Sequence, residues 1–244
     1  MKPSNLKKVM IRAVILISMV IAGSLQILPW SEPIAAQAAG LDEIWMDWVQ
    51  YESGDNYAQA GGDGGLSYGR YQFNLEYSLP EFMQFCLERS PDEYAVFLRY
   101  VGGEADDPQI VTTSGLDVAW QQLYDEQSAS FAALQDEFLL TGYYYPVQDG
   151  LSRLYDIDLN QYSAVLKGTV LSVALRDGSV VSTKQRCNCL ATVTDTYYAG
   201  IPEMEWVEAI YDAESKKHPD QAKRWGVVQK EAALAKLNEL LCTE

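Results

Sequence analysis

A glutamate lies at the end of a predicted helix, on its apolar face and directly before a glycine-rich loop. The apolar residues of this face recur at spacings of three and four, which is the pattern of a helix: Leu41, Ile44, Trp45, Trp48 and Val49. One further step reaches Glu52, directly before Ser53 and Gly54. Burial beside apolar side chains and the negative end of the helix dipole both disfavour a charged carboxylate there. A carboxyl group that keeps its proton is what general-acid cleavage of a glycosidic bond requires. The alternative is that Glu52 only ends the helix and turns to solvent.

A second carboxylate follows in the loop. An inverting glycoside hydrolase needs a base about 6.5–9.5 Å from its acid, with room for a water molecule. Asp63, in the run Gly62-Asp63-Gly64-Gly65, is the first candidate for this base, and Asp55 is the second. An Asp-Gly turn fits the same residues equally well. A lytic transglycosylase needs no such base, because a hydroxyl group of the sugar itself attacks.

Polar and aromatic residues around this loop are candidates for binding a sugar chain. The run from Leu66 to Gln72 has the composition of a short strand or hairpin. Tyrosine rings stack on the faces of pyranose sugars, and the polar groups donate or accept hydrogen bonds. The candidate substrate-binding residues are Ser53, Asp55, Ser67, Tyr68, Tyr71, Gln72 and Tyr144. For Tyr144, packing at a helix end is the competing interpretation.

The elements that must position these residues are mainly helices. Apolar periodicity predicts a mostly α-helical domain with a small β or loop insertion after its first helix. The glycines between residues 54 and 69 interrupt the helical pattern and mark this insertion. Further helices are predicted over Leu79–Glu88, Pro91–Val101, Leu116–Tyr124, Ser128–Thr141, Gln161–Arg176, Met204–Ala213 and Val227–Leu241.

The first 38 residues have the pattern of a signal peptide. Four basic residues precede an apolar run, and small residues close it at Ala36-Gln37-Ala38. We therefore expect residues 39–244 to form one domain that is secreted, or associated with the cell wall, and is not inserted in the membrane after cleavage. An uncleaved N-terminal anchor is the alternative.

Composition excludes some classes of function. The 244 residues include 18 basic and 34 acidic side chains, a formal charge of −16, which argues against a nucleic-acid partner. Without residues 1–38 the charge becomes −19. A single histidine, His218 in a loop-like sequence, rules out sites built on several histidines, so no cofactor or metal is expected.

Four cysteines lie after residue 38, where export permits oxidation. Cys187 and Cys189 are too close in the chain to pair comfortably with each other, so bridges to Cys86 and Cys242 are expected. A zinc site built on the Cys-x-Cys pair is the competing interpretation.

The stretch from Glu52 to Gln72 resembles the catalytic signature of the lysozyme superfamily. In that signature a helix-terminal Glu-Ser precedes, by about twenty residues, a Gly-containing strand that ends in Gln. Here Glu52-Ser53-Gly54, the loop with Asp63 and the run Ser67-Tyr68-Gly69-Arg70-Tyr71-Gln72 supply the pattern. It is most similar to lysozyme-like modules of bacterial exported proteins, phage tail proteins and secretion-spike proteins. The resemblance continues more weakly over most of the mature chain, but the helix around Leu171–Arg176 offers no match to a family base.

The resemblance implies a lysozyme-like helical fold and a monomeric glycosidase or lytic transglycosylase with Glu52 as its acid. Its substrate would be a β-1,4-linked aminosugar polymer, with peptidoglycan as the first choice. A chitosanase-like hydrolase is one alternative, because an acidic protein suits a cationic polymer. A non-catalytic module that binds glycans or cell walls is another.

Overall fold

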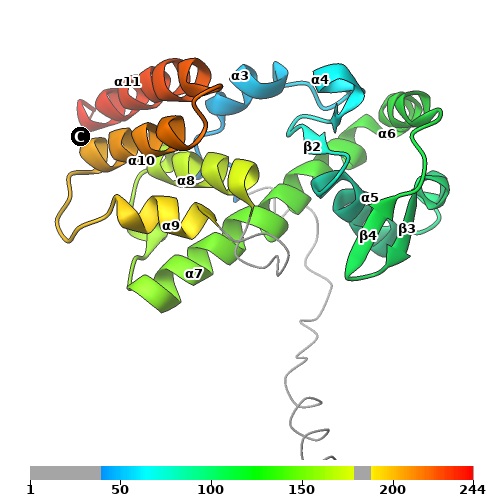
Figure 1. The fold of residues 1–244 in the computed structure, drawn as a ribbon, viewed down its shortest axis with the longest axis horizontal. Helices are drawn as coiled ribbons and strands as arrows, with labels where there is room; N and C mark the ends of the chain where they lie inside the picture. Colours follow the sequence, from blue (N-terminus) through cyan, green and yellow to red (C-terminus); the bar gives the residue numbers. More distant parts are fainter. Residues whose placement is uncertain (1–39, 179–187, 244) are drawn as a thin grey trace, which may run out of the picture. The chain divides into compact units, whose positions relative to one another are not determined.

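The computed structural model describes residues 40–178 and 188–243, and these residues are mostly helical (Figure 1). This confirms the predicted fold class. The short elements before the long helices are η1 Asp47–Val49, α3 Gln50–Ser53, α4 Gly62–Gly65, β1 Ser67–Tyr68 and β2 Phe73–Asn74. The remaining elements are α5 Ser78–Arg89, η2 Ala95–Arg99, β3 Val101–Glu104, β4 Asp107–Ile110, α6 Leu116–Leu139, η3 Leu140–Tyr144, α7 Tyr145–Tyr155, η4 Leu159–Gln161, α8 Ala164–Asp177, α9 Asn188–Asp195, α10 Glu203–Lys217, η5 Arg224–Gln229 and α11 Lys230–Leu241.

The first predicted helix is shorter than its apolar pattern indicates. Residues 40–44 form turns, and regular helix is confined to η1 and α3. The amide of Trp45 donates to the carbonyl of Ala164 at 2.9 Å, so this backbone bonds to another segment rather than to its own helix. The Trp45 carbonyl also approaches Gly168 so closely that a Cβ there would lie 2.1 Å from its oxygen. Packing against α8 therefore replaces the first turns of the expected helix.

The insertion after α3 is the predicted hairpin. Strands β1 and β2 pair antiparallel, with Ser67 opposite Asn74 and Tyr68 opposite Phe73. Gly69 in the connecting turn has a φ of +73°, a conformation that suits glycine. The hairpin is followed directly by α5, which overlaps the predicted helix Leu79–Glu88.

A second hairpin occupies part of a segment that was predicted to be helical. Within Pro91–Val101 only η2 is helical, and β3 then pairs antiparallel with β4. Gly103, with a φ of +99°, allows the Asp107 carbonyl to approach to 2.6 Å from where a Cβ would lie. The apolar spacing of residues 91–101 arises from buried Tyr94, Phe97 and Tyr100, which a 3₁₀ turn places inward as well as an α-helix does.

The middle of the chain also departs from the predicted boundaries. The helices predicted at Leu116–Tyr124 and Ser128–Thr141 form one helix, α6, which is kinked where Gln127 has φ −141° and ψ 39°. The α7 helix was not predicted, since Pro146 and Gly150 are poor helix formers inside a helix. Pro146 lies in the first turn of α7, which continues directly from the π-helical turn η3.

The longest buried helix surface belongs to α8, in which every residue from Val165 to Ala174 is buried. Helices α9, α10 and α11 pack against it, and Figure 1 shows α8 beside the α9–α10 pair. Its N-terminus is capped by Ser163, whose hydroxyl accepts from the amides of Val165 and Leu166. This rigid helix carries Arg176 and Asp177 at its C-terminal end.

The cysteine predictions are corrected by the structure. Cys86 is buried, Cys242 is exposed, and both are free thiols, so the expected bridges to Cys187 or Cys189 do not form. Cys187 itself, and the predicted signal peptide at residues 1–38, lie outside the described residues. None of the helices in the described ranges is long and apolar enough to cross a bilayer.

Candidate active site at Glu52

Glu52 lies near the end of α3, and its side chain is only 12% exposed. Its carboxylate is held by side chains of η5. Oε1 accepts from Trp225 Nε1 at 2.9 Å and from Gln229 Nε2 at 2.7 Å, and Oε2 accepts from Arg224 Nη1 at 3.1 Å. Glu52 therefore does not turn to solvent, and its carboxylate has a fixed orientation.

A second guanidinium lies behind this carboxylate. Arg176 Nη1 is 4.0 Å from Glu52 Oε1, and its side chain is 9% exposed. Arg176 also contacts Glu214 Oε2 at 3.4 Å and Gln229 Oε1 at 3.3 Å, with its guanidinium 4.4 Å from the centre of the Trp225 ring. The prediction that Glu52 lies among apolar side chains is thus wrong. Hydrogen-bond donors and cations more than 120 positions away in sequence line the site. The apolar spacing of residues 41–49 could not indicate these distant partners.

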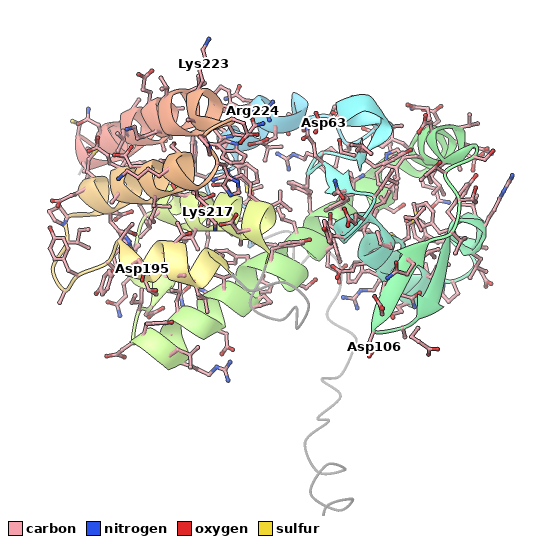
Figure 2. The ribbon with its side chains drawn as sticks, in the orientation of Figure 1. Asp63, Asp106, Asp195, Lys217, Lys223 and Arg224 are labelled. Atoms are coloured by element: carbon pink, nitrogen blue, oxygen red, sulfur yellow. The ribbon has the colours of Figure 1, made fainter. Side chains whose placement is uncertain are left out.

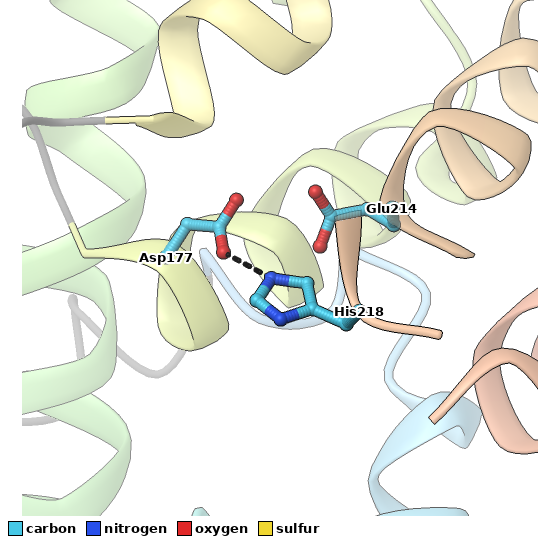
Figure 3. A group of neighbouring side chains, drawn as sticks. All are labelled: Asp177, Glu214 and His218. Carbon is cyan, nitrogen blue, oxygen red and sulfur yellow. Dashed lines mark hydrogen bonds and ion pairs between the residues drawn. The ribbon is translucent and has the colours of Figure 1, made fainter. Parts of the chain in front are cut away.

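Acidic and basic side chains continue this cluster beyond Arg176. Figure 3 shows Asp177, Glu214 and His218 together, with His218 Nε2 3.0 Å from Asp177 Oδ1. Burial raises the pKa of the Glu214 carboxyl, Arg176 opposes this rise, and Asp177 adds to it. His218, expected as a solvated loop residue, instead contacts the buried Asp177 carboxyl group through its ring.

The same three residues present ligand atoms within 4.8 Å of one another, a spacing at which a metal ion could bind. However, Lys217 pairs with both Asp177 and Glu214, and Arg176 pairs with Glu214. These cations already balance the two carboxylates. The group is therefore explained as an internal ion-pair cluster without a metal.

The β1–β2 hairpin holds the backbone on the other side of Glu52. Gln72 donates through Nε2 to the Glu52 carbonyl, and the Ser53 hydroxyl donates to the Arg70 carbonyl. Two of the predicted binding residues, Ser53 and Gln72, therefore fix the position of the Glu52 segment through backbone groups. Their assignment to substrate binding stays a prediction.

Arg70 in this hairpin connects further predicted residues. Its guanidinium pairs with Asp55 Oδ1 at 2.5 Å and donates to the hydroxyls of Tyr57 and Tyr71 at 2.7 and 2.9 Å. Tyr71, 2% exposed, donates in turn to Asp136 at 2.6 Å. Burial raises the pKa of both the Tyr71 hydroxyl and the Asp136 carboxyl. Asp55 and Tyr71 are thus held in a network beside the site.

The other predicted residues are dispersed. Tyr68, Ser67 and Tyr144 are buried, and the Tyr68 hydroxyl donates to Asp117. Asp63 is exposed in α4, and the described hydrogen bonds and ion pairs of the Glu52 carboxylate do not include it. Figure 2 shows Asp63 and Arg224 along the same edge of the view, on the two sides of α3. The residues that sequence analysis missed are Arg176, Arg224, Trp225 and Gln229.

The missed residues left a weak signal. Three of them fall within Arg224–Gln229, a π-helical turn, and such turns are frequent at functional sites. The turn brings Arg224, Trp225 and Gln229 to the same carboxylate. Arg224 and Gln229 are polar, so a search for apolar periodicity does not single them out.

Comparison with known proteins decides the family. A family model described as type VI secretion system spike protein VgrG3-like, C-terminal, matches residues 49–236. The chain belongs to this family. No curated protein and no solved structure matched the chain. The matched residues include Glu52 and every residue that contacts its carboxylate.

This membership corrects the assignment made from the Glu52–Gln72 motif. The VgrG3-like C-terminal family is a different family from the lysozyme superfamily, so the resemblance to that superfamily was misleading. The function inferred through it, a secreted lysozyme-like enzyme that degrades the peptidoglycan of cell walls, with its chitosanase-like and wall-binding alternatives, is overturned by the same match. Membership in a secretion-spike family is consistent with a secreted protein.

Proposed function

We propose that this chain acts with a type VI secretion spike as an exported enzyme domain, a glycosidase whose catalytic carboxyl group is Glu52. The spike context rests on the family description, whose model covers residues 49–236. The enzymatic part rests on the Glu52 carboxylate, which is largely buried yet fixed at both oxygens by three donors.

The geometry around Glu52 is that of a preorganised reactive group. Trp225 and Gln229 both donate to Oε1, which fixes the plane of the carboxyl group. Oε2 has one hydrogen bond, from Arg224, whose side chain is 41% exposed. Of the two oxygens, Oε2 is therefore the one that faces the accessible side and exchanges a proton with a substrate.

The segment that follows Glu52 leaves its backbone accessible at three glycines. At Gly54, Gly64 and Gly65 a Cβ would meet no atom within 4 Å, so the backbone there is open to close approach. Asp63 lies exposed within the same loop. A polysaccharide laid along this loop would have its glycosidic oxygen near Glu52 and its hydroxyls near exposed backbone groups.

The test of catalysis compares single substitutions on a panel of polysaccharides. Release of reducing ends or soluble fragments should occur with the wild type and fall about 10²–10⁴-fold in Glu52→Gln, because a neutral amide cannot transfer the proton. Glu126→Gln is the matched control, since Glu126 is exposed and accepts only a surface hydrogen bond from Gln122. Equal activity of wild type and Glu52→Gln would contradict the catalytic assignment.

The spike context has a separate test. In a bacterium with a type VI secretion system, the amount of this chain in the medium should fall to background when the spike is deleted. Release that is unchanged without the spike would contradict this part of the proposal.

A further inference from the structure

Gly226 lies in the π-helical turn η5, directly after Trp225. A Cβ at residue 226 would lie 2.0 Å from Ser215 Oγ and 2.8 Å from Ser215 Cβ, both in α10. Non-bonded carbon atoms approach to about 3.5–4.0 Å, so a side chain at this position would force η5 away from α10. The glycine therefore lets the turn lie directly against α10.

Two further contacts join α10 to the segment formed by η5 and α11, and Figure 1 shows α10 and α11 side by side. The His218 ring packs edge-on against the Trp225 ring, with centroids 5.2 Å apart. Lys230 Nζ pairs with Asp212 Oδ1 at 2.7 Å. The partners run in opposite directions along the two segments, so the segments pack antiparallel. The contact at Gly226 lies between the other two along the chain.

The same turn supplies every described hydrogen bond of the Glu52 carboxylate. Trp225 Nε1 and Gln229 Nε2 reach Oε1 at 2.9 and 2.7 Å. A π-turn joins residues five apart through its backbone, and Arg224 and Gln229, which are five apart, both reach this carboxylate. A side-chain contact of about 3.6 Å is no longer a hydrogen bond, so moving η5 by about 1 Å would break or misalign these bonds.

We propose that Gly226 is a positioning residue: its close contact with Ser215 sets the place of η5 at which this turn holds the Glu52 carboxylate. The inference rests on the proposed function, in which that carboxylate transfers a proton. Gly226 has no side chain and acts through its neighbours in the turn. Misplacing a catalytic group by about 1 Å can cost about 10²-fold in rate. The loss should fall on kcat, because Gly226→Ala leaves the side chains that contact the substrate unchanged.

Gly226→Ala tests the contact, with polysaccharide cleavage as the first readout. We expect kcat to fall about 10–100-fold, while KM changes by about twofold or less. Gly142→Ala is the matched control, because Gly142 also lies in a π-helical turn, η3. A Cβ there would lie 3.7 Å from its nearest neighbour, an atom of the Phe138 ring, which is an ordinary contact distance. Gly142→Ala should therefore keep the kcat of the wild type.

Substitution of Ser215 should restore the Gly226→Ala variant in steps. Ser215→Ala removes the hydroxyl group but leaves the Cβ at 2.8 Å, whereas Ser215→Gly removes both atoms. Against the corresponding Ser215 single variants, the loss of kcat should shrink in part with Ser215→Ala and to about threefold or less with Ser215→Gly. A glycine inside α10 lowers helix stability, so it would not rescue a variant that was only unstable.

The indole signal of Trp225 reports the same geometry without substrate. Its Nε1–H donates to Glu52 Oε1, and a hydrogen bond to a carboxylate moves the proton resonance downfield. Trp225→Phe identifies the signal in a nitrogen-correlated NMR spectrum. The signal should move upfield in Gly226→Ala, as in Glu52→Gln, and should return when Ser215→Gly is added. It should stay in place in Gly142→Ala.

Two results would overturn the inference. One is a folded Gly226→Ala with the kcat of the wild type and an unmoved Trp225 signal, and the other is a loss that Ser215→Gly does not reduce. If Gly226→Ala does not fold, the variant that combines it with Ser215→Ala is measured against the same criteria, since only the Cβ contact remains there. Failure of the proposed function looks different. The wild type then cleaves no polysaccharide, while the Trp225 signal still moves in Gly226→Ala and returns with Ser215→Gly.

Discussion

Gln229 connects the Glu52 carboxylate to the Arg176 guanidinium. It is fully buried, donates to Glu52 Oε1 at 2.7 Å and accepts from Arg176 Nη1 at 3.3 Å. Gln229→Met keeps similar length and helix propensity but removes both interactions. Hydrogen bonds to charged groups are each worth about 1.5–3 kcal/mol. Glu52 and Arg176 each keep other partners, so we expect a loss of about 2–4 kcal/mol in the free energy of unfolding.

The assay is urea unfolding, with Gln122→Met as the matched control. Gln122 also donates to a carboxylate, Glu126 at 2.8 Å, but this pair is exposed on α6 and should be worth about 0.5 kcal/mol or less. In a domain of this size the Gln229→Met loss corresponds to a melting temperature lower by roughly 4–16 °C. The loss of unfolding free energy caused by Gln229→Met should be smaller in a protein that already carries Glu52→Gln. Equal stability of Gln229→Met and Gln122→Met would contradict the claim that the buried hydrogen bonds of Gln229 stabilise the site.

Three further predictions follow from other features. Burial raises the pKa of the Glu214 carboxyl group, so the folded protein binds its proton more tightly than the unfolded chain, which loses it above about pH 4. The melting temperature should therefore be higher at pH 5 than at pH 7. Glu214→Gln should reduce that difference. Gly69→Ala should lower the free energy of unfolding by about 2–4 kcal/mol, because its Cβ would lie 2.9 Å or less from a buried tryptophan and glutamine. Gly64→Ala, with a similar φ and open space, should cost about 1 kcal/mol, and equal costs would contradict the packing argument. A thiol reagent should label Cys242 in the folded protein and leave Cys86 unlabelled until unfolding; early labelling of Cys86 would contradict its burial.

Local sequence patterns predicted those parts of the structure that local interactions determine. The hairpin after Glu52 follows from Gly69 and its flanking residues, and α5 and α8 follow from apolar periodicity. Residues 41–46 failed to continue as helix because the Trp45 amide bonds to Ala164, a contact that no local pattern contains.

The candidate site was predicted only at its first residue. The position of Glu52 on the inner face of its helix was found from spacing, but its partners Arg224, Trp225 and Gln229 come from a π-helical turn far along the chain. The tyrosines predicted to stack on sugars have partners that the local sequence does not indicate. Tyr68 and Tyr71 each lie 2% exposed, because their hydroxyls find acidic partners on α6 inside the fold.

The same motif also produced the error about family. A Glu-Ser-Gly, a glycine loop and a Tyr-Gln strand are short, and local geometry alone can favour them: Gly54 ends α3 at a φ of +70°, and Gln72 holds the Glu52 carbonyl. The match over residues 49–236 uses the whole domain and takes precedence over a motif of about twenty residues.

The most direct test of the central claim is mass spectrometry of polysaccharide digests made with the wild type, Glu52→Gln and Glu126→Gln. The account predicts new oligosaccharide fragments with the wild type and with Glu126→Gln, and a rate lower by about 10²–10⁴-fold with Glu52→Gln that remains folded. Fragments formed at the same rate by folded Glu52→Gln, or by none of the three proteins, would contradict the role of Glu52 as a catalytic carboxyl group.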